Sequence, residues 1–93
     1  MSVHFSTDEL AVAVDQYVGD TLISDYSKGV NNDLERLAAG DAADIVDNIL
    51  DAMAKKFNIC YAEVIEFLSF IRNRAIDAAK DILEFEFGFT FID

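Results

Sequence analysis

One segment of the chain, residues 41–57, places apolar and acidic side chains on opposite sides of a helix. At 100° per residue its large apolar residues fall on one side and its aspartates on the other. The apolar set is Ile45, Val46, Ile49, Leu50, Met53 and Phe57, and the acidic set is Asp41, Asp44, Asp47 and Asp51. The pattern predicts an amphipathic helix with one face in a core and the other in water.

Helical spacing also marks the N-terminal part of the chain, and no proline interrupts it. Ser6 and Glu9 form an S-x-x-E capping box, so we expect a helix from Thr7. Gly19 leaves two alternatives, because it can end this helix or form a weak point inside a helix that runs to Ser27. The apolar phase shifts just after Gly19, which favours a break or a kink.

Two more helices are expected, one short and one long. Asn32 with Glu35 offers a capping pair for a short helix that ends at Gly40. The last helix is expected from about Tyr61 to Glu84. Its apolar stripe comprises Val64, Phe67, Leu68, Ile71, Ala75, Ala78, Ala79 and Ile82. A helix of this length spans about 36 Å and would be the element on which the others pack.

The C-terminal segment, residues 85–92, changes to a period of two. Phe85, Phe87, Phe89 and Phe91 alternate with other residues, which places them on one face of a strand. Residues 2–5 are the only other strand candidate. If the two termini pair, they add a minor two-stranded β element to the fold. If they do not, the phenylalanine-rich strand leaves an edge open to association.

The fold class that follows is all-α, a compact bundle of three to four helices in a single domain, residues 1–93. The hydrophobic content of 53% excludes a disordered chain, because disorder requires low hydrophobicity as well as high charge. A chain of this length buries about 60% or more of its unfolded surface in one small core.

Acidic residues outnumber basic ones by 18 to 7, which gives a net charge of −11. Such a surface repels nucleic acid and anionic membranes and attracts basic proteins. We therefore expect neither direct nucleic-acid binding nor membrane binding. The expected partner is a basic protein, in particular one that handles nucleic acid.

No residue pattern predicts catalysis, a metal site or a cofactor. His4 is the only histidine, and the carboxylates are too evenly spread to single out a catalytic pair. The aspartates of residues 41–51 follow helical spacing and not the alternating ligand positions of a calcium loop. We expect a non-enzymatic protein without cofactors.

The single cysteine, Cys60, cannot form an internal disulfide, and its apolar context predicts a small buried side chain. Neither a basic, apolar leader nor a run of about 20 apolar residues is visible. These features predict a cytoplasmic protein, located in the host cytoplasm if a phage encodes it.

Two functions fit these observations. The row Asp41, Asp44, Asp47 and Asp51 can imitate a phosphate strand and occupy a basic groove, although it can also be a solvated face that aids solubility. In composition the chain is similar to the small acidic phage proteins that act against restriction or CRISPR machinery. The first hypothesis is therefore an inhibitor that blocks the nucleic-acid-binding surface of its partner.

The second hypothesis is a self-associating adaptor or structural subunit that forms a homodimer. It rests on the C-terminal phenylalanines Phe87, Phe89 and Phe91 and on Phe70. On the last helix Phe70 falls among charged residues, on the side away from the apolar stripe. Such an aromatic needs cover, from another element of the chain or from a partner.

Overall fold

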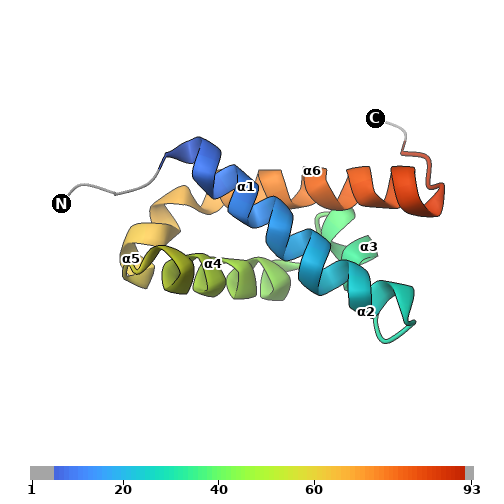
Figure 1. The fold of residues 1–93 in the computed structure, drawn as a ribbon, viewed down its shortest axis with the longest axis horizontal. Coiled ribbons are helices and arrows are strands. Elements are labelled where there is room, and N and C mark those ends of the chain that lie inside the picture. The colour runs from blue at the N-terminus through green and yellow to red at the C-terminus, as the bar shows by residue number, and fades with distance from the viewer. Residues whose placement is uncertain (1–5, 92–93) are drawn as a thin grey trace.

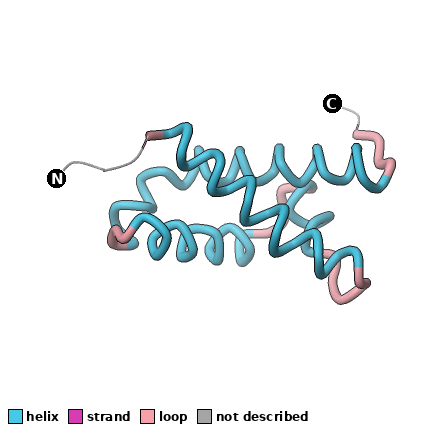
Figure 2. The backbone as a smooth tube through the Cα atoms, viewed as in Figure 1, coloured by secondary structure: helices cyan, strands magenta, loops and turns pink. Residues whose placement is uncertain are grey.

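A computed structural model describes residues 6–91, and this part of the chain consists of helices joined by short connections (Figure 2). No strand forms within residues 6–91, and the predicted all-α fold class is confirmed. The elements are α1 (Thr7–Tyr17), η1 (Val18–Leu22), α2 (Ile23–Ser27), α3 (Asp33–Ala38), α4 (Ala43–Phe57), α5 (Tyr61–Val64), η2 (Ile65–Phe67) and α6 (Leu68–Phe87).

The first helix begins where its capping signal predicts. The Oγ atom of Ser6 accepts a hydrogen bond from the Glu9 N–H at 3.1 Å. The helix then continues through η1, which is a π-helical turn that contains Gly19, and ends as α2 at Ser27. A π turn adds a residue to the helical repeat, and this addition explains the shift of the apolar phase. Of the two alternatives, the helix with an internal irregularity is therefore observed.

The short helix α3 forms as expected, but its capping residue was predicted wrongly. Asn32 stands at the N-cap position and its side chain makes no capping hydrogen bond. The Oδ1 atom of Asn31 instead accepts the Asp33 N–H at 3.1 Å. An asparagine two residues before the donor forms an Asx turn, a local arrangement that competes with N-capping. Gly40 ends the helix in the left-handed conformation, at φ 80°.

The amphipathic pattern of residues 41–57 is confirmed, although helix α4 itself begins only at Ala43. Asp41 consequently lies in the connection before the helix. At the other end Asn58 adopts φ 54°, and the Ile59 N–H donates to the Ala54 carbonyl at 3.0 Å. These features form a Schellman motif, which turns the chain away from α4.

The long C-terminal helix is less regular than its sequence pattern predicts. The single turn of α5 leads into a 3₁₀ turn, η2, before α6 begins at Leu68. Leu68 was expected in the core and is 38% exposed, whereas Leu83, near the end of α6, is completely buried. The predicted stripe is therefore buried in two parts, at Val64 before the 3₁₀ turn and at Ile71, Ala75 and Ala79 after it.

The predicted C-terminal strand is wrong. Helix α6 continues through Phe87, and Gly88 then takes a left-handed conformation at φ 72°. The Phe89 N–H donates to the Leu83 carbonyl at 3.0 Å, which folds the end of the chain back on the helix. Continued helix satisfies backbone groups within one segment, whereas a strand requires a neighbouring chain segment. The expected partner strand, residues 2–5, lies outside the described residues.

The helices pack into an elongated and thin body, with extents of 43 × 27 × 20 Å; Figure 1 is viewed along the shortest of these. Helix α1 crosses α4 and α6 and packs on both, while α3 packs mainly against α6. Their inward faces form one core, in which every buried residue of the described chain is hydrophobic. The completely buried large side chains are Leu10, Val14, Val18, Leu34, Ile49, Leu50, Val64, Ile71 and Leu83. Because no charged residue of this range is buried, its acidic groups lie at or near the surface.

Candidate functional site

The acidic face predicted on residues 41–51 is present and exposed. Asp44, Asp47 and Asp51 project from α4, and Asp41 precedes the helix. From Asp44 to Asp51 the helix rises by about 10 Å, at 1.5 Å per residue. The side chains form a row because three and four residues correspond to nearly one helical turn.

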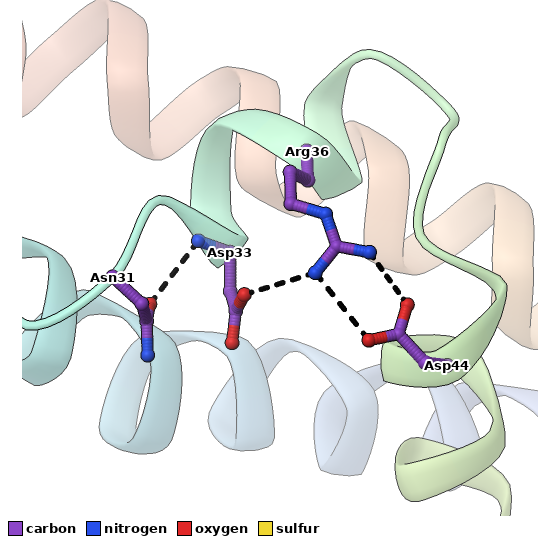
Figure 3. A network of polar contacts seen from close by, with 4 residues as sticks. All are labelled: Asn31, Asp33, Arg36 and Asp44. Atoms are coloured by element: carbon purple, nitrogen blue, oxygen red, sulfur yellow. Dashed lines mark hydrogen bonds and ion pairs between the residues drawn. The ribbon is translucent and has the colours of Figure 1, made fainter.

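Two members of this row are already paired with basic residues. Arg36 of α3 holds Asp44 through two hydrogen bonds of 2.7 and 3.3 Å, and it also contacts Asp33 at 3.2 Å (Figure 3). The hydrogen bond from Arg36 is the main reason why the pKa of Asp44 lies below its usual value. Lys55 pairs with Asp51 at 3.1 Å, one turn along α4.

Asp41 and Asp47 make no ion pair with any residue that the structure describes. The negative potential of the α4 face therefore comes mainly from these two carboxylates. The row is a weaker phosphate imitation than the sequence pattern predicts, because tertiary contacts neutralise part of it.

A second acidic row, which was not predicted as a site, lies on α6. Asp77, Asp81 and Glu84 follow one another at spacings of four and three residues, and all three are exposed. The last turn of α6 contains no basic residue. The same helical spacing that marks the α4 row would have revealed this one.

Arg74 lies beside the second row and is engaged by α1. It binds Asp15 through a fork of two hydrogen bonds, 2.9 and 2.6 Å long. The hydrogen bond to Asp15 is the main cause of the raised pKa of Arg74, and the charges of Asp77 and Asp81 contribute. Arg74 therefore stands among three carboxylates, and Lys80 of the same helix lies over the Phe91 ring at 6.0 Å, so the carboxylates outnumber the basic groups on this face.

The phenylalanines predicted for self-association do not form one surface. Phe70 remains 37% exposed, so the described elements cover it only in part. Phe87 meets Tyr26 edge to face at 4.9 Å, while Phe89 and Phe91 stack at 6.2 Å and pack partly against the core. Seventeen residues separate Phe70 from Phe87, which corresponds to about 25 Å along the chain of helical turns. Of the predicted set, the structure shows only Phe89 and Phe91 in contact with each other.

Cys60 is exposed, and its predicted burial is therefore wrong. It stands at the N-cap of α5, where its Sγ atom lies 3.2 Å from Oε1 of Glu63. Of its neighbours in sequence, Ile59 is only partly buried against the core and Tyr61 is 46% exposed, so this part of the chain faces water. His4 lies outside the described residues.

An apolar pocket of about 230 Å³ opens between α3, α4 and α6. Its apolar lining includes Leu37, Val46, Leu68 and Ile76. Asp47 of α4 and Arg72 of α6 also line it. This pocket was not foreseen, because Leu68 was assigned to the core.

Comparisons with protein-family models, with curated proteins and with solved structures give no match. In the part of the chain that the structure covers, no three or more His, Cys, Asp or Glu side chains are grouped so as to hold a metal ion. No helix of residues 6–91 has the length and apolar character needed to cross a membrane.

Proposed function

We propose that this protein is a non-enzymatic inhibitor that binds a basic protein and blocks its nucleic-acid-binding surface. The observation that carries the proposal is the display of carboxylates in straight rows on two outward helix faces, α4 and α6. None of the described charged residues is buried, so the carboxylates that make no ion pair within the fold are accessible to a partner.

The spacing of these rows suits a groove that normally holds a nucleic-acid strand. Acids three or four residues apart advance about 5 Å per step on a rigid helix. DNA carries one phosphate per about 3.4 Å of each strand. A helix row is therefore a sparser array than DNA, and two rows on one small molecule compensate in part for the lower density.

The position of the α6 row supports binding over solubility alone. Glu84 and Glu86 lie in the last turn of α6, where the negative end of the helix dipole disfavours carboxylates. A face that served only solubility would gain stability from basic residues there. A basic partner would remove this unfavourable interaction when it binds.

The test begins with capture of partners from nuclease-treated host lysate, followed by measurement of the affinity of the captured protein. We expect tight binding at about 0.1 M salt, weaker binding at about 0.5 M salt, and competition by duplex DNA. Two variants each remove three carboxylates from one row: Asp44→Asn/Asp47→Asn/Asp51→Asn on helix α4, which keeps Asp41, and Asp77→Asn/Asp81→Asn/Glu84→Gln on α6. Each changes the net charge by the same amount, from −11 to −8, because three negative charges are removed.

A variant with glutamate at Asp44, Asp47 and Asp51 serves as the matched control, since it keeps the charge and should keep the affinity. Loss of at least tenfold in affinity for one neutralised row would identify the binding face. The proposal is wrong if the captured protein binds equally well at both salt concentrations and with both rows neutralised, or if DNA does not compete.

A further inference from the structure

The side of the α4–α6 pair on which α3 packs is only partly covered. Helix α3 contains six residues, and the apolar pocket opens where this helix ends at Gly40. Leu68 lines the pocket while 38% exposed, and Ile65, one turn earlier on the same side of the chain, is 37% exposed. Apolar side chains are therefore exposed both in the pocket and just before it in the chain.

The charged residues of this pocket have opposite signs. Asp47 lies on the α4 wall and Arg72 on the α6 wall. Neither makes an ion pair with another residue of the range 6–91. An arginine without a carboxylate partner is unexpected in a chain with 18 acidic residues. The pocket therefore offers an apolar hollow, one free cation and one free anion.

We propose that this pocket is the interface of a homodimer, in which a second copy of the chain packs face to face around a two-fold axis. In such an interface each contact occurs twice, so a face must be complementary to itself. Asp47 of each copy would pair with Arg72 of the other. Ile65 and Leu68 of each copy would cover the pocket of its partner.

The signs of these charges favour a second copy over an unrelated basic partner. A partner with a basic face would pair with Asp47 but would be repelled by Arg72, whereas a copy of the chain supplies the matching group for each. The net charge of −11 opposes dimerisation, and salt screens this repulsion over distances of about 8 to 10 Å at physiological ionic strength. Desolvated pairs inside the interface are screened less, so a dimer of modest affinity is expected at that ionic strength.

The dimer goes beyond the proposed function. It would engage Asp47 of the α4 row, but it leaves the α6 row exposed, so binding of a basic partner through α6 does not depend on it. If both hold, the dimer presents two α6 acidic rows, which raises the avidity for a partner with two basic sites. Failure of the dimer would leave the binding of a basic partner untouched, and the two results are measured separately.

The experiment measures the dimer dissociation constant by sedimentation equilibrium at about 0.15 M salt. We expect Asp47→Arg and Arg72→Asp each to raise the constant at least tenfold, because each places like charges opposite one another. The double variant Asp47→Arg/Arg72→Asp restores the pairs in exchanged positions and should return the constant to within about threefold of the original.

Two further variants separate this interface from general charge effects. Asp77→Arg changes the net charge as Asp47→Arg does, but it lies on the α6 acidic row and should not weaken the dimer. Ala43→Trp places a large side chain in the pocket from an exposed position at the start of α4, and it should abolish dimerisation while the circular dichroism spectrum stays helical.

The proposal is overturned if the unmodified protein sediments as a monomer up to about 1 mM, a dissociation constant that corresponds to only about −4 kcal/mol of binding free energy. It is also overturned if the double variant stays as weak as the single ones, or if Ala43→Trp leaves the constant unchanged.

Discussion

The phenylalanines near the C-terminal end of the chain occupy very different environments. Phe85 is 84% exposed on the outer side of α6, while Phe89 is half-buried against the core after the chain has turned back at Gly88. A strand would have placed both on the same face. The observed fold instead gives each phenylalanine its own contacts.

This difference predicts unequal effects of the same substitution. Phe85→Ser should change the free energy of unfolding by less than about 0.5 kcal/mol, because the side chain has few contacts to lose. Phe89→Ser should lower it by about 2 kcal/mol, since it removes roughly half of the area of a buried phenylalanine. Urea unfolding at neutral pH measures both values. Equal losses would show that the two residues share one environment, as they would in a strand.

The behaviour of these residues was beyond prediction from the sequence for a specific reason. Alternation fits a strand only if another segment supplies the backbone hydrogen bonds, and the sequence does not reveal whether such a segment is near. The left-handed turn at Gly88 is also favoured by the packing of Phe89 against the core, which is not visible in the sequence. Cys60 was misjudged similarly, because its apolar neighbours did not reveal that it caps a helix.

At the scale of elements, two glycines of the helical framework have different backbone conformations. Gly19 lies within the π turn at an ordinary helical φ, and a Cβ atom added there would meet no other atom within 4 Å. Gly88 ends α6 at φ 72°, a conformation that residues with a side chain rarely adopt.

Alanine substitution should therefore have opposite effects at these two positions. Gly19→Ala should raise the free energy of unfolding by about 0.5 to 1 kcal/mol, because alanine restricts the unfolded chain and fits the folded one. Gly88→Ala should lower it by about 1 to 2 kcal/mol, since it forces a Cβ atom into the left-handed region. Thermal and urea unfolding of both variants checks the signs. A loss of stability in Gly19→Ala would mean that the π turn needs glycine for a reason other than space.

The amphipathic helices were the most predictable part of the fold. The core face of α4 follows directly from its sequence, because five of the predicted apolar residues, all but the half-buried Phe57, are buried. The 3₁₀ turn η2 carries no comparable signal, since its residues suit a regular helix equally well. As a result the exposure of Leu68, and with it the pocket, could not be anticipated.

At the scale of the whole molecule, the acidic bias is visible in the sequence but its local balance is not. Arg74 and Asp15 are 59 residues apart in the chain and form an ion pair at 2.6 Å. Arg36 reaches Asp44 across the connection between two helices. Such pairs decide which carboxylates remain available, and they appear only once the helices are packed.

The net charge predicts a dependence of stability on salt. A surface of −11 repels itself, and the described ion pairs are exposed and therefore of small individual value. Raising sodium chloride from about 0.02 M to about 0.5 M should increase the melting temperature by about 4 to 8 °C, which corresponds to about 1 kcal/mol. The variant Asp77→Asn/Asp81→Asn/Glu84→Gln should show a smaller increase. A fall in the melting temperature would mean that attractive pairs outweigh the repulsion.

The shortest dimension of the molecule is 20 Å, which is about the width of two helices. In a body this thin, each long helix covers a large share of the core. Removal of any one of them would therefore expose much of the core to water. A partly unfolded molecule therefore keeps little of its buried apolar surface, and intermediate states have little to stabilise them. Because the molecule is thin, the stability of each of α1, α4 and α6 depends on the other two. We therefore expect the molecule to unfold as one cooperative unit.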